Sequence, residues 1–242
     1  WVRPHIAVIT GIAPVHLERM KSLENILDAK SEIVELAGSV VINGDDELLL
    51  NQARLWTNQK LVFDCSITSN QAMVFVDFQN GTHSIFVKGK KLLTVDAPEL
   101  LQLSIALSTG VLLALDLNVS EYFSKITSLD KTSHRQSVIT SDLGHKIIDN
   151  SFNSNPMAIE HSLKLFSDES TTDSKKYLVT PGMIELGSDQ FSLNYAFGVE
   201  SSKVIDQALV IGHTNKNSLL LAFQENNIPA YWFPNRTEAV NY

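Results

Sequence analysis

The sequence predicts an α/β protein in which a parallel sheet with a small antiparallel meander is followed by a smaller, doubly wound unit. Three observations lead to this fold class. Short apolar, β-rich runs alternate with stretches of helical spacing, which is typical of parallel sheets flanked by helices. Between Met73 and Val95 the strands become shorter and glycine-containing turns separate them. Beyond the polar stretch at residues 130–135, a new strand–helix alternation begins.

The first part of the chain has the pattern of a buried parallel sheet with its connecting helices. The run Ile6–Thr10 is apolar and rich in β-branched residues, and apolar residues in the stretch that follows recur near helical spacing. Later runs repeat this alternation. The expected strands are residues 6–10, 39–43 and 60–64, and the expected helices are residues 22–36 and 47–55.

The meander is predicted from its turns. Asn80-Gly81 and Lys88-Gly89-Lys90 are turn sequences between short apolar runs, which favours antiparallel hairpins. Pro98 then opens a long apolar helix, because proline suits the first turn of a helix. The expected strands are residues 73–78, 84–88 and 92–95, and one more helix is expected at residues 120–128.

The second half repeats the alternation with shorter elements. Its apolar strands and helices can bury a core of their own, so we expect two domains, residues 1–131 and residues 132–242. The expected strands are residues 137–140, 146–149, 177–180, 208–211 and 230–233. The expected helices are residues 156–166, 189–200 and 217–226.

Composition limits the classes of function. Apolar residues make up 44% and charged residues 19% of the 242 residues, so a packed core is feasible. The net charge of -8 argues against nucleic acid and anionic membranes as partners, since both attract basic surfaces. The most apolar stretch, residues 100–117, contains Gln102 and Asp116, which suits a buried helix and not a membrane span. A single cysteine, Cys65, fits a reducing cytoplasm and reads as a strand-end thiol more readily than as a nucleophile.

Two residues near the start of the chain are candidates for chemistry. His16 follows the first strand and a Gly/Pro turn, so it is expected at the carboxyl edge of the sheet, where open α/β sheets bind ligands. Lys30 lies on the next helix, whose return can bring it back to that edge. Taken singly, such a histidine is usually structural and such a lysine is usually a solvated charge.

Together they form a longer pattern. The stretch from Arg3 to Glu35, with a strand and turn before His16 and then Ala29-Lys30-Ser31-Glu32, resembles the strand–turn–His and Ala-Lys-x-Glu segment of the Mur ligase family. The resemblance implies that His16 binds a second Mg²⁺ and that Lys30 is carbamylated and becomes a metal-binding carboxylate. Asn43-Gly44-Asp45-Asp46 resembles the family's Asn-Ala-Asp-Asp turn, and reads equally well as a turn and helix cap.

Two segments of the second half point to one branch of that family, the one that adds D-alanyl-D-alanine. Residues 149–156, Asp-Asn-Ser-Phe-Asn-Ser-Asn-Pro, resemble its Asp-Asp-Ser-Tyr-Asn-Ala-Asn-Pro run, although a capped strand-to-helix turn would explain them too. Residues 180–187, Thr-Pro-Gly-Met-Ile-Glu-Leu-Gly, resemble its Gly-Asp-Met-x-Glu-Leu-Gly. The resemblance implies nucleotide contacts at Arg135, Asp149, Asn150 and Asn43, and substrate contacts at Asn153, Asn155 and Glu185.

The chain also departs from the family. It contains no Gly-x-x-Gly-Lys-Thr phosphate loop, residues 96–102 replace the motif that holds adenine, and Asn150 stands where the family has an aspartate. By resemblance, residues 1–131 are the C-terminal part of the central ATP-binding domain, with a partial ATPase-type sheet. Residues 132–242 are a Rossmann-like C-terminal domain that lacks its end. We expect such an incomplete chain to be inactive by itself.

The resemblance implies an ATP- and Mg²⁺-dependent ligase of peptidoglycan precursor synthesis. Its substrates would be UDP-muramoyl-tripeptide and D-alanyl-D-alanine, joined through an acyl phosphate. Two alternatives stay open: a sibling such as a folylpolyglutamate or cyanophycin synthetase, and a degenerate, non-catalytic binding protein. The third residue of the stem peptide and the oligomeric state are not encoded in any recognisable pattern.

Overall fold

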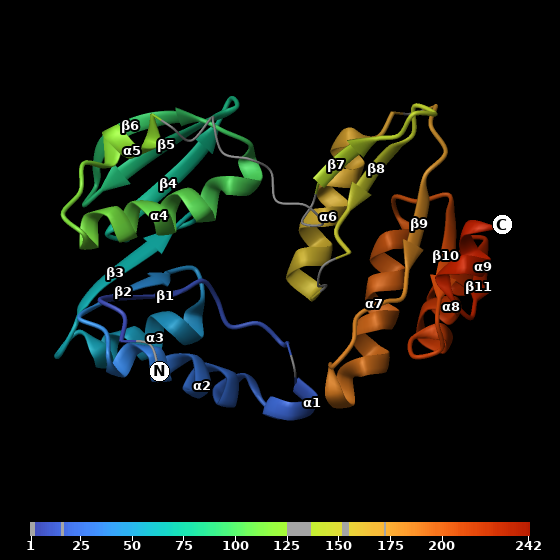
Figure 1. Ribbon diagram of the computed structural model, residues 1–242, viewed down its shortest axis with the longest axis horizontal. Helices are drawn as coiled ribbons and strands as arrows, with labels where there is room; N and C mark the ends of the chain where they lie inside the picture. The colour runs from blue at the N-terminus through green and yellow to red at the C-terminus, as the bar shows by residue number, and fades with distance from the viewer. Residues whose placement is uncertain (1–2, 16, 125–136, 152–154, 172) are drawn as a thin grey trace. The chain divides into compact units, whose positions relative to one another are not determined.

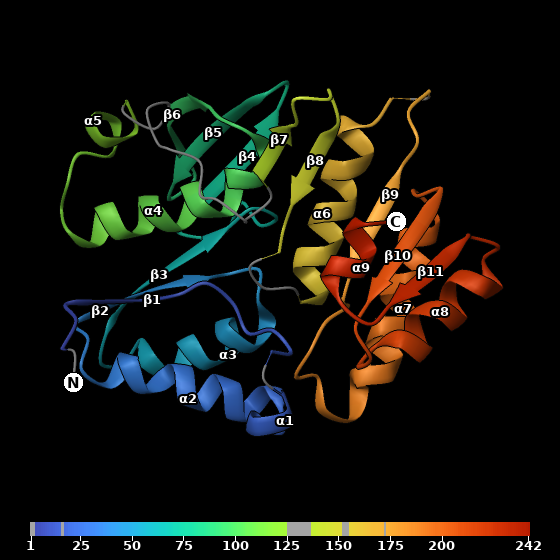
Figure 2. The same cartoon turned by 45° about the vertical axis from the view of Figure 1, so that its right-hand side comes forward.

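A computed structural model describes residues 3–15, 17–124, 137–151, 155–171 and 173–242. The chain forms two compact units (Figures 1 and 2). Unit 1 comprises residues 1–12 and 23–130, and unit 2 comprises residues 13–22 and 131–242. The assignment of residues 1–131 and 132–242 to two domains stays a prediction.

Unit 1 contains one six-stranded sheet in the order β1-β2-β3-β4-β5-β6. The first four strands are parallel, and the last three form an antiparallel meander that continues the same sheet. Asn80-Gly81 and Lys88-Gly89 make its two turns, all four residues with positive φ, as the sequence predicted. The strands are β1 (Ile6–Ile9), β2 (Ser39–Asn43), β3 (Leu61–Ser66), β4 (Val74–Gln79), β5 (Thr82–Val87) and β6 (Lys90–Asp96).

Helices cover both faces of the parallel part of this sheet (Figure 1). The long apolar helix α4 (Gln102–Ala114), which follows the short 3-10 helix η1 (Glu99–Leu101), packs across β2, β3 and β4. The other helices are α2 (Leu23–Glu35), α3 (Glu47–Trp56) and α5 (Val119–Phe123). Because both faces are covered, Val40, Val41 and Ile42 of β2 are fully buried.

The approach of α4 to the sheet depends on Gly110. A Cβ atom at this position would lie 2.6 Å from the Cys65 Sγ and 2.8 Å from a Val41 methyl carbon. The apolar stretch at residues 100–117 is thus a core helix, as predicted. Within the part of the chain that the structure describes, every helix is too short or too polar to traverse a bilayer.

Unit 2 is built on a three-stranded parallel sheet in the order β11-β10-β9. Helices α6, α7 and α8 contribute Ile159, Phe197 and Phe223 to its core. The strands are β9 (Tyr177–Thr180), β10 (Gln207–Ile211) and β11 (Ala230–Phe233). The helices are α1 (Leu17–Met20), α6 (Pro156–Glu169), η3 (Gly187–Asp189), α7 (Gln190–Ser202), α8 (Lys216–Glu225) and α9 (Arg236–Val240).

The first two strands of this half differ from expectation. β7 (Ser137–Thr140) and β8 (Lys146–Asp149) pair with each other as an antiparallel hairpin and form a separate two-stranded sheet. Gly144, with φ of +81°, lies in their turn. The predicted α/β fold class is otherwise confirmed, with a mostly parallel six-stranded sheet and a second parallel sheet.

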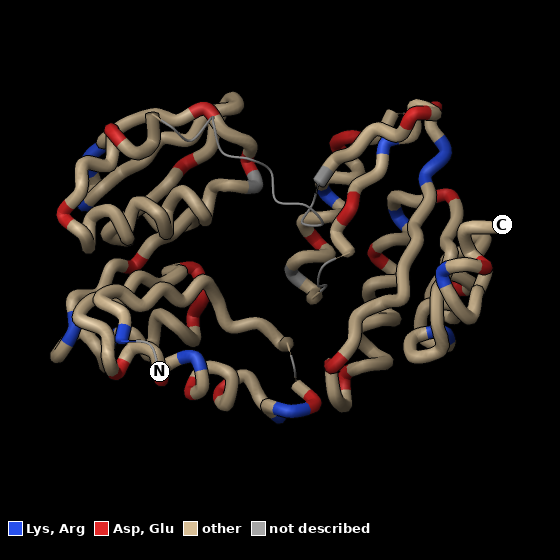
Figure 3. The backbone as a smooth tube through the Cα atoms, in the orientation of Figure 1, with Lys and Arg blue, Asp and Glu red and all other residues tan. Residues whose placement is uncertain are grey.

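Charge is distributed over both units. Acidic residues outnumber basic ones, 27 to 19, and Figure 3 shows both kinds on helices, strands and loops throughout the chain. The acidic excess is larger in unit 1, which has 14 acidic and 8 basic residues, than in unit 2, which has 13 and 11.

Candidate functional site

The carboxyl ends of β1, β2 and β3 meet at one edge of the unit 1 sheet, because the three strands are parallel. The turn at Gly11-Ile12 follows β1, the turn at residues 44–46 follows β2, and Ile67-Thr68 follows β3. Polar side chains connect these three turns. This edge is the place where the sequence predicted ligand chemistry.

Lys30 reaches this edge from α2. Its half-buried side chain crosses to the turn after β1, where Nζ donates a 2.6 Å hydrogen bond to the Gly11 carbonyl oxygen. As the sequence suggested, the helix thus brings Lys30 back to the carboxyl edge of the sheet. A lysine that is tied to a backbone carbonyl 19 residues away is a fixed group and not a freely solvated charge.

Asp46 joins the turns after β1 and β2. One carboxylate oxygen accepts from the Ile12 amide at 2.6 Å, and the other accepts from the Leu49 amide at 3.1 Å and caps α3. The helix-cap interpretation of this turn is thus correct for Asp46. The same carboxylate also fixes the backbone beside the Gly11 carbonyl that Lys30 binds.

Asp45 joins the turns after β2 and β3. Its carboxylate accepts from the Ser66 and Thr68 hydroxyl groups at 2.5 Å each and from the Ile67 amide at 2.8 Å. The side chain of Asn43 is buried and accepts from the Asp45 amide at 3.0 Å, which shapes the turn. The nucleotide contact that the resemblance implies for Asn43 stays a prediction.

Cys65 is fully buried in β3 beneath α4. Burial, together with the neighbouring Asp64 carboxylate, raises the pKa of its thiol to about 12. A thiol that stays protonated at neutral pH and lacks access to solvent is a poor nucleophile. The interpretation of Cys65 as a structural thiol therefore fits its environment.

The Cys65 thiol should resist alkylation in the folded protein. Because burial favours the neutral form, we expect iodoacetamide at pH 8 to react at least about tenfold more slowly than in the urea-unfolded chain. Mass spectrometry of timed samples measures both rates. Equal rates would show that this part of the core opens readily to reagent.

In unit 2, the segment after β8 makes local bonds. Asp149 accepts from the Ser151 amide at 3.0 Å, and the Asn150 amide donates to the Ser162 hydroxyl at 2.8 Å. Asn155 caps α6 by accepting from the Ala158 amide at 2.9 Å. The helix cap that the residues themselves suggested is therefore present at Asn155, and the ligand contacts implied for Asp149, Asn150 and Asn155 stay predictions.

The loop after β9, residues 181–187, presents Glu185 to solvent. Glu185 has φ of +63°, in the left-handed region that a non-glycine residue seldom adopts. Its neighbours Met183 and Leu186 are buried. The structure therefore exposes the predicted substrate residue on a loop whose two flanks are anchored in the core.

Three predicted site residues, His16, Arg135 and Asn153, lie outside the described residues. Among the residues that the structure does describe, no group of three or more histidine, cysteine, aspartate or glutamate side chains is arranged to hold a metal ion. The metal set that the resemblance implies, His16 with Lys30, stays a prediction.

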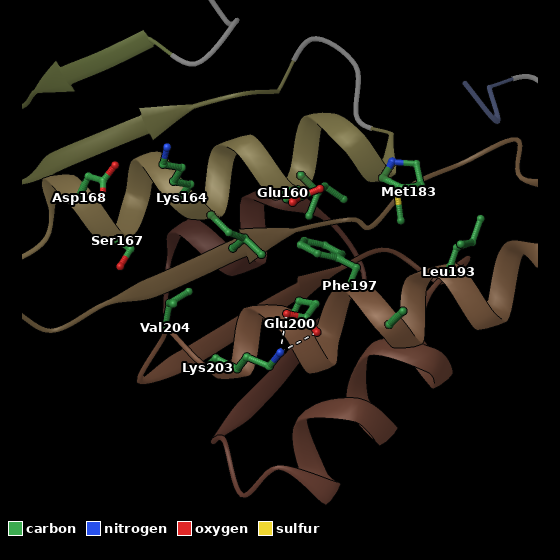
Figure 4. Close-up of a pocket in the computed structure, with 14 residues that line it drawn as sticks. Glu160, Lys164, Ser167, Asp168, Met183, Leu193, Phe197, Glu200, Lys203 and Val204 are labelled. Atoms are coloured by element: carbon green, nitrogen blue, oxygen red, sulfur yellow. Dashed lines mark hydrogen bonds and ion pairs between the residues drawn. The ribbon is translucent and has the colours of Figure 1, made fainter. Parts of the chain in front are cut away.

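A groove of about 600 Å³ lies between α6 and α7 in unit 2 (Figure 4). Ile159, Leu163 and Phe197 give it an apolar lining, and Lys203 is paired with Glu200 at 2.6 Å beside it. Met183 of the loop after β9 also lines the groove. The groove and the Glu185 loop therefore share one side chain.

Sequence reasoning missed the side chains that hold this loop, Gln190, Asn194 and Asn215. Asn194 is fully buried although it lies within α7, where asparagine is unfavourable. Asn215 precedes α8 and reads as an ordinary helix cap. A buried asparagine on the apolar face of a helix is the one signal that could have revealed this cluster.

Comparison with known proteins shows what the first part of the chain is similar to. Residues 1–100 match the family model of the Mur ligase middle domain. This part of the chain is therefore similar to the middle domain of Mur ligases. The relationship extends further, since the UDP-N-acetylmuramoyl-tripeptide–D-alanyl-D-alanine ligase of Bacillus subtilis (strain 168) is 25% identical over 253 residues, 92% of this chain and 54% of that protein. The chain thus spans about half the length of this Mur ligase.

Solved structures show the same fold. MurF of Acinetobacter baumannii has a TM-score of 0.80 at 18% identity, over 99% of this chain and 52% of that one. MurF of Thermotoga maritima in complex with ADP has a TM-score of 0.74 at 20% identity, over 97% and 54%. FolC of E. coli in complex with DHPP and ADP has a TM-score of 0.72 at 17% identity, over 99% and 55%. The Mur ligase fold therefore covers both units.

Proposed function

We propose that a protein containing this chain is an ATP-dependent ligase that adds D-alanyl-D-alanine to UDP-muramoyl-tripeptide in peptidoglycan precursor synthesis. The observation that carries the proposal is the sequence relationship to a UDP-N-acetylmuramoyl-tripeptide–D-alanyl-D-alanine ligase, which extends over 92% of the chain and so includes both units. The segments at residues 149–156 and 180–187, which distinguish this branch by resemblance, both lie in unit 2.

The proposed reaction has two steps. A tripeptide carboxylate oxygen attacks the γ-phosphorus of ATP, which forms an acyl phosphate and releases ADP. The amine of D-alanyl-D-alanine then attacks the acyl carbon, phosphate leaves, and the nitrogen gives up a proton as the amide forms. Enzymes of phosphoryl and acyl transfer act mainly by positioning and electrostatic stabilisation. The fixed turns at the unit 1 edge suit that task.

Lys30 is the residue of this edge that we assign to metal binding. Mg²⁺ prefers hard oxygen ligands, so an unmodified ammonium group does not fit it, whereas a carbamylated lysine presents a carboxylate. The Gly11 carbonyl, 2.6 Å from Nζ, and the Asp46 carboxylate bring further oxygen atoms to the same turns. When bound, the metal would neutralise phosphate charge. We add His16 to this set by resemblance, and Arg135, Asp149, Asn150 and Asn43 to the nucleotide site.

The substrate contacts are proposed for unit 2. Glu185 is exposed on the loop after β9, where a carboxylate can attract the ammonium group of the incoming dipeptide. Asn155 caps α6 at the end of the segment that contains Asn153. The Glu185 assignment corresponds to the carboxyl end of β9, and such strand ends are where open α/β sheets commonly bind ligands.

A folylpolyglutamate synthetase is the second candidate, favoured by the TM-score of 0.72 with FolC. An assay of the protein that contains this chain separates the two. We expect phosphate release with ATP, UDP-muramoyl-tripeptide and D-alanyl-D-alanine. The product should have the mass of the tripeptide substrate plus that of the dipeptide, less one water molecule. Turnover of a folate with glutamate instead would support the sibling, and no turnover with either pair would support a non-catalytic member.

A further inference from the structure

Three side-chain amides surround the loop between β9 and α7. They belong to Gln190, Asn194 and Asn215, and the two asparagines are 0% and 2% exposed. Burying a side-chain amide costs free energy unless the amide is hydrogen-bonded, so the hydrogen-bond partners of these three residues indicate the role of the cluster.

Asn215 connects the loops that follow two neighbouring strands. It lies between β10 and α8, and its Nδ2 donates to the carbonyl oxygens of Pro181 and Met183 at 2.9 and 2.7 Å. Its Oδ1 accepts from Gln190 Nε2 at 2.6 Å. Although asparagine is a preferred helix cap, its side chain makes no cap hydrogen bond to α8. Its side-chain bonds go to the loop after β9 and to Gln190 of α7 instead.

Asn194 and Gln190 hold the same loop from α7. Asn194 Oδ1 accepts from the Met183 amide at 2.7 Å, and its Nδ2 donates to the Met183 carbonyl at 3.1 Å. Gln190 Oε1 accepts from the Leu186 amide at 3.1 Å. The backbone is thus fixed on both sides of Ile184 and Glu185.

Gly182 lets the two asparagines come this close. A Cβ atom at this position would lie 2.6 Å from Asn215 Nδ2 and would also collide with Asn194 Oδ1. The φ of +76° at Gly182 independently favours glycine. The backbone at position 182 therefore passes the two asparagine side chains in a conformation that favours glycine.

The result of this restraint is the conformation of Glu185. A non-glycine residue in the left-handed region persists when its surroundings over-determine it, and such residues gather at functional sites. Here the strained residue is an exposed acid at the carboxyl end of a parallel strand.

We propose that Asn215, assisted by Asn194, is a positioning residue that holds the loop at residues 181–187 so that Glu185 stands ready for a cationic group of the substrate. The identity of that group, the ammonium of D-alanyl-D-alanine, rests on the proposed function. The positioning of the loop does not, because it follows from contacts within unit 2.

The test is hydrogen exchange in the 242-residue chain with Asn215→Asp. This substitution keeps the shape of the side chain but replaces Nδ2 by an oxygen that faces two carbonyl oxygens. We expect the Met183 and Leu186 amides to exchange at least about tenfold faster, since roughly two hydrogen bonds are lost. The Val210 amide in β10 should keep its rate. Asn226→Asp is the matched control, because Asn226 Nδ2 donates to the Ala222 carbonyl of α8, the helix that Asn226 caps, and not to the loop after β9.

Unchanged loop exchange in Asn215→Asp would overturn the proposal, and so would equal acceleration at Val210, which would indicate a general core role. If Asn215→Asp does not fold, Asn215→Ser retains one donor and should give the same pattern with a smaller change. In the ligation assay, Asn215→Asp should raise the KM for D-alanyl-D-alanine and leave the KM for ATP unchanged. Two results together would separate the proposals. If the loop amides of Asn215→Asp exchange faster but the unsubstituted protein shows no ligation, the positioning role stands and the ligase function is refuted.

Discussion

Lys30→Ala is expected to lower the ligation turnover of a protein that contains this chain by about 10³-fold, because a metal-binding group contributes several kcal/mol to charge stabilisation. The fold should be retained. The Lys30 side chain is half-buried and donates to the Gly11 carbonyl, whereas Ile26 and Leu27 are the side chains that α2 buries. Phosphate release measures the loss, and circular dichroism checks the fold.

Lys60 offers a matched control. Its Nζ also donates to a backbone carbonyl at 2.6 Å, that of Ala37, but it does so away from the Gly11 turn. Lys60→Ala should therefore leave turnover within about twofold. Acetate or formate added to Lys30→Ala should restore part of the activity by standing in for the carbamate. Full activity of Lys30→Ala would remove the carbamate from the proposed mechanism.

Most strands and helices could be predicted because their hydrophobic period and turn residues agree. The Asn80-Gly81 and Lys88-Gly89 turns made the antiparallel meander predictable, and Pro156 indicated where α6 begins. Boundaries shifted where pairing extends a strand past its apolar run. β3 continues to Ser66, beyond the predicted residue 64, because Cys65 pairs with both Asn43 and Val74.

The β7–β8 hairpin shows what the pattern could not decide. Alternation of strands with helices indicates that strands are present but not which strand pairs with which. β8 is followed by α6, as a strand of a parallel sheet would be, yet its hydrogen bonds go to β7 across a short turn. Local pairing loses less chain entropy than a crossover of more than 20 residues, which favours the hairpin.

The candidate site residues also fall into two groups, those that the sequence could reveal and those that only the structure reveals. Lys30 and Glu185 could be found because a contiguous motif surrounds each of them. Asn194 and Asn215 are 21 residues apart and form a cluster only through the loop at residues 181–187, to which both bond. A side chain that acts on backbone atoms leaves no periodic pattern in the sequence. Such residues become visible only when burial and bonding are known.

Gly110→Ala is expected to destabilise unit 1 by about 2–3 kcal/mol, through overpacking of a close-packed core. Helix propensity by itself predicts the opposite sign, a gain of about 1 kcal/mol for alanine over glycine. The clash should prevail, because the added methyl group would lie 2.6 Å from Cys65 Sγ and 2.8 Å from a Val41 methyl carbon, both fully buried. Urea unfolding monitored by fluorescence or circular dichroism measures the change.

Cys65→Ala supplies the decisive comparison, since it removes the sulfur atom that the new methyl group would meet. With Cys65→Ala as background, Gly110→Ala should cost at least about 1 kcal/mol less than in the natural sequence, a coupling expected only of residues in contact. Ser108→Ala, an exposed alanine substitution on the same helix, should change stability by less than about 0.5 kcal/mol. Strict additivity of the two core substitutions, or a net gain from Gly110→Ala, would mean that α4 does not approach β3 this closely. The position of α4 is the feature on which the burial and the raised pKa of Cys65 depend.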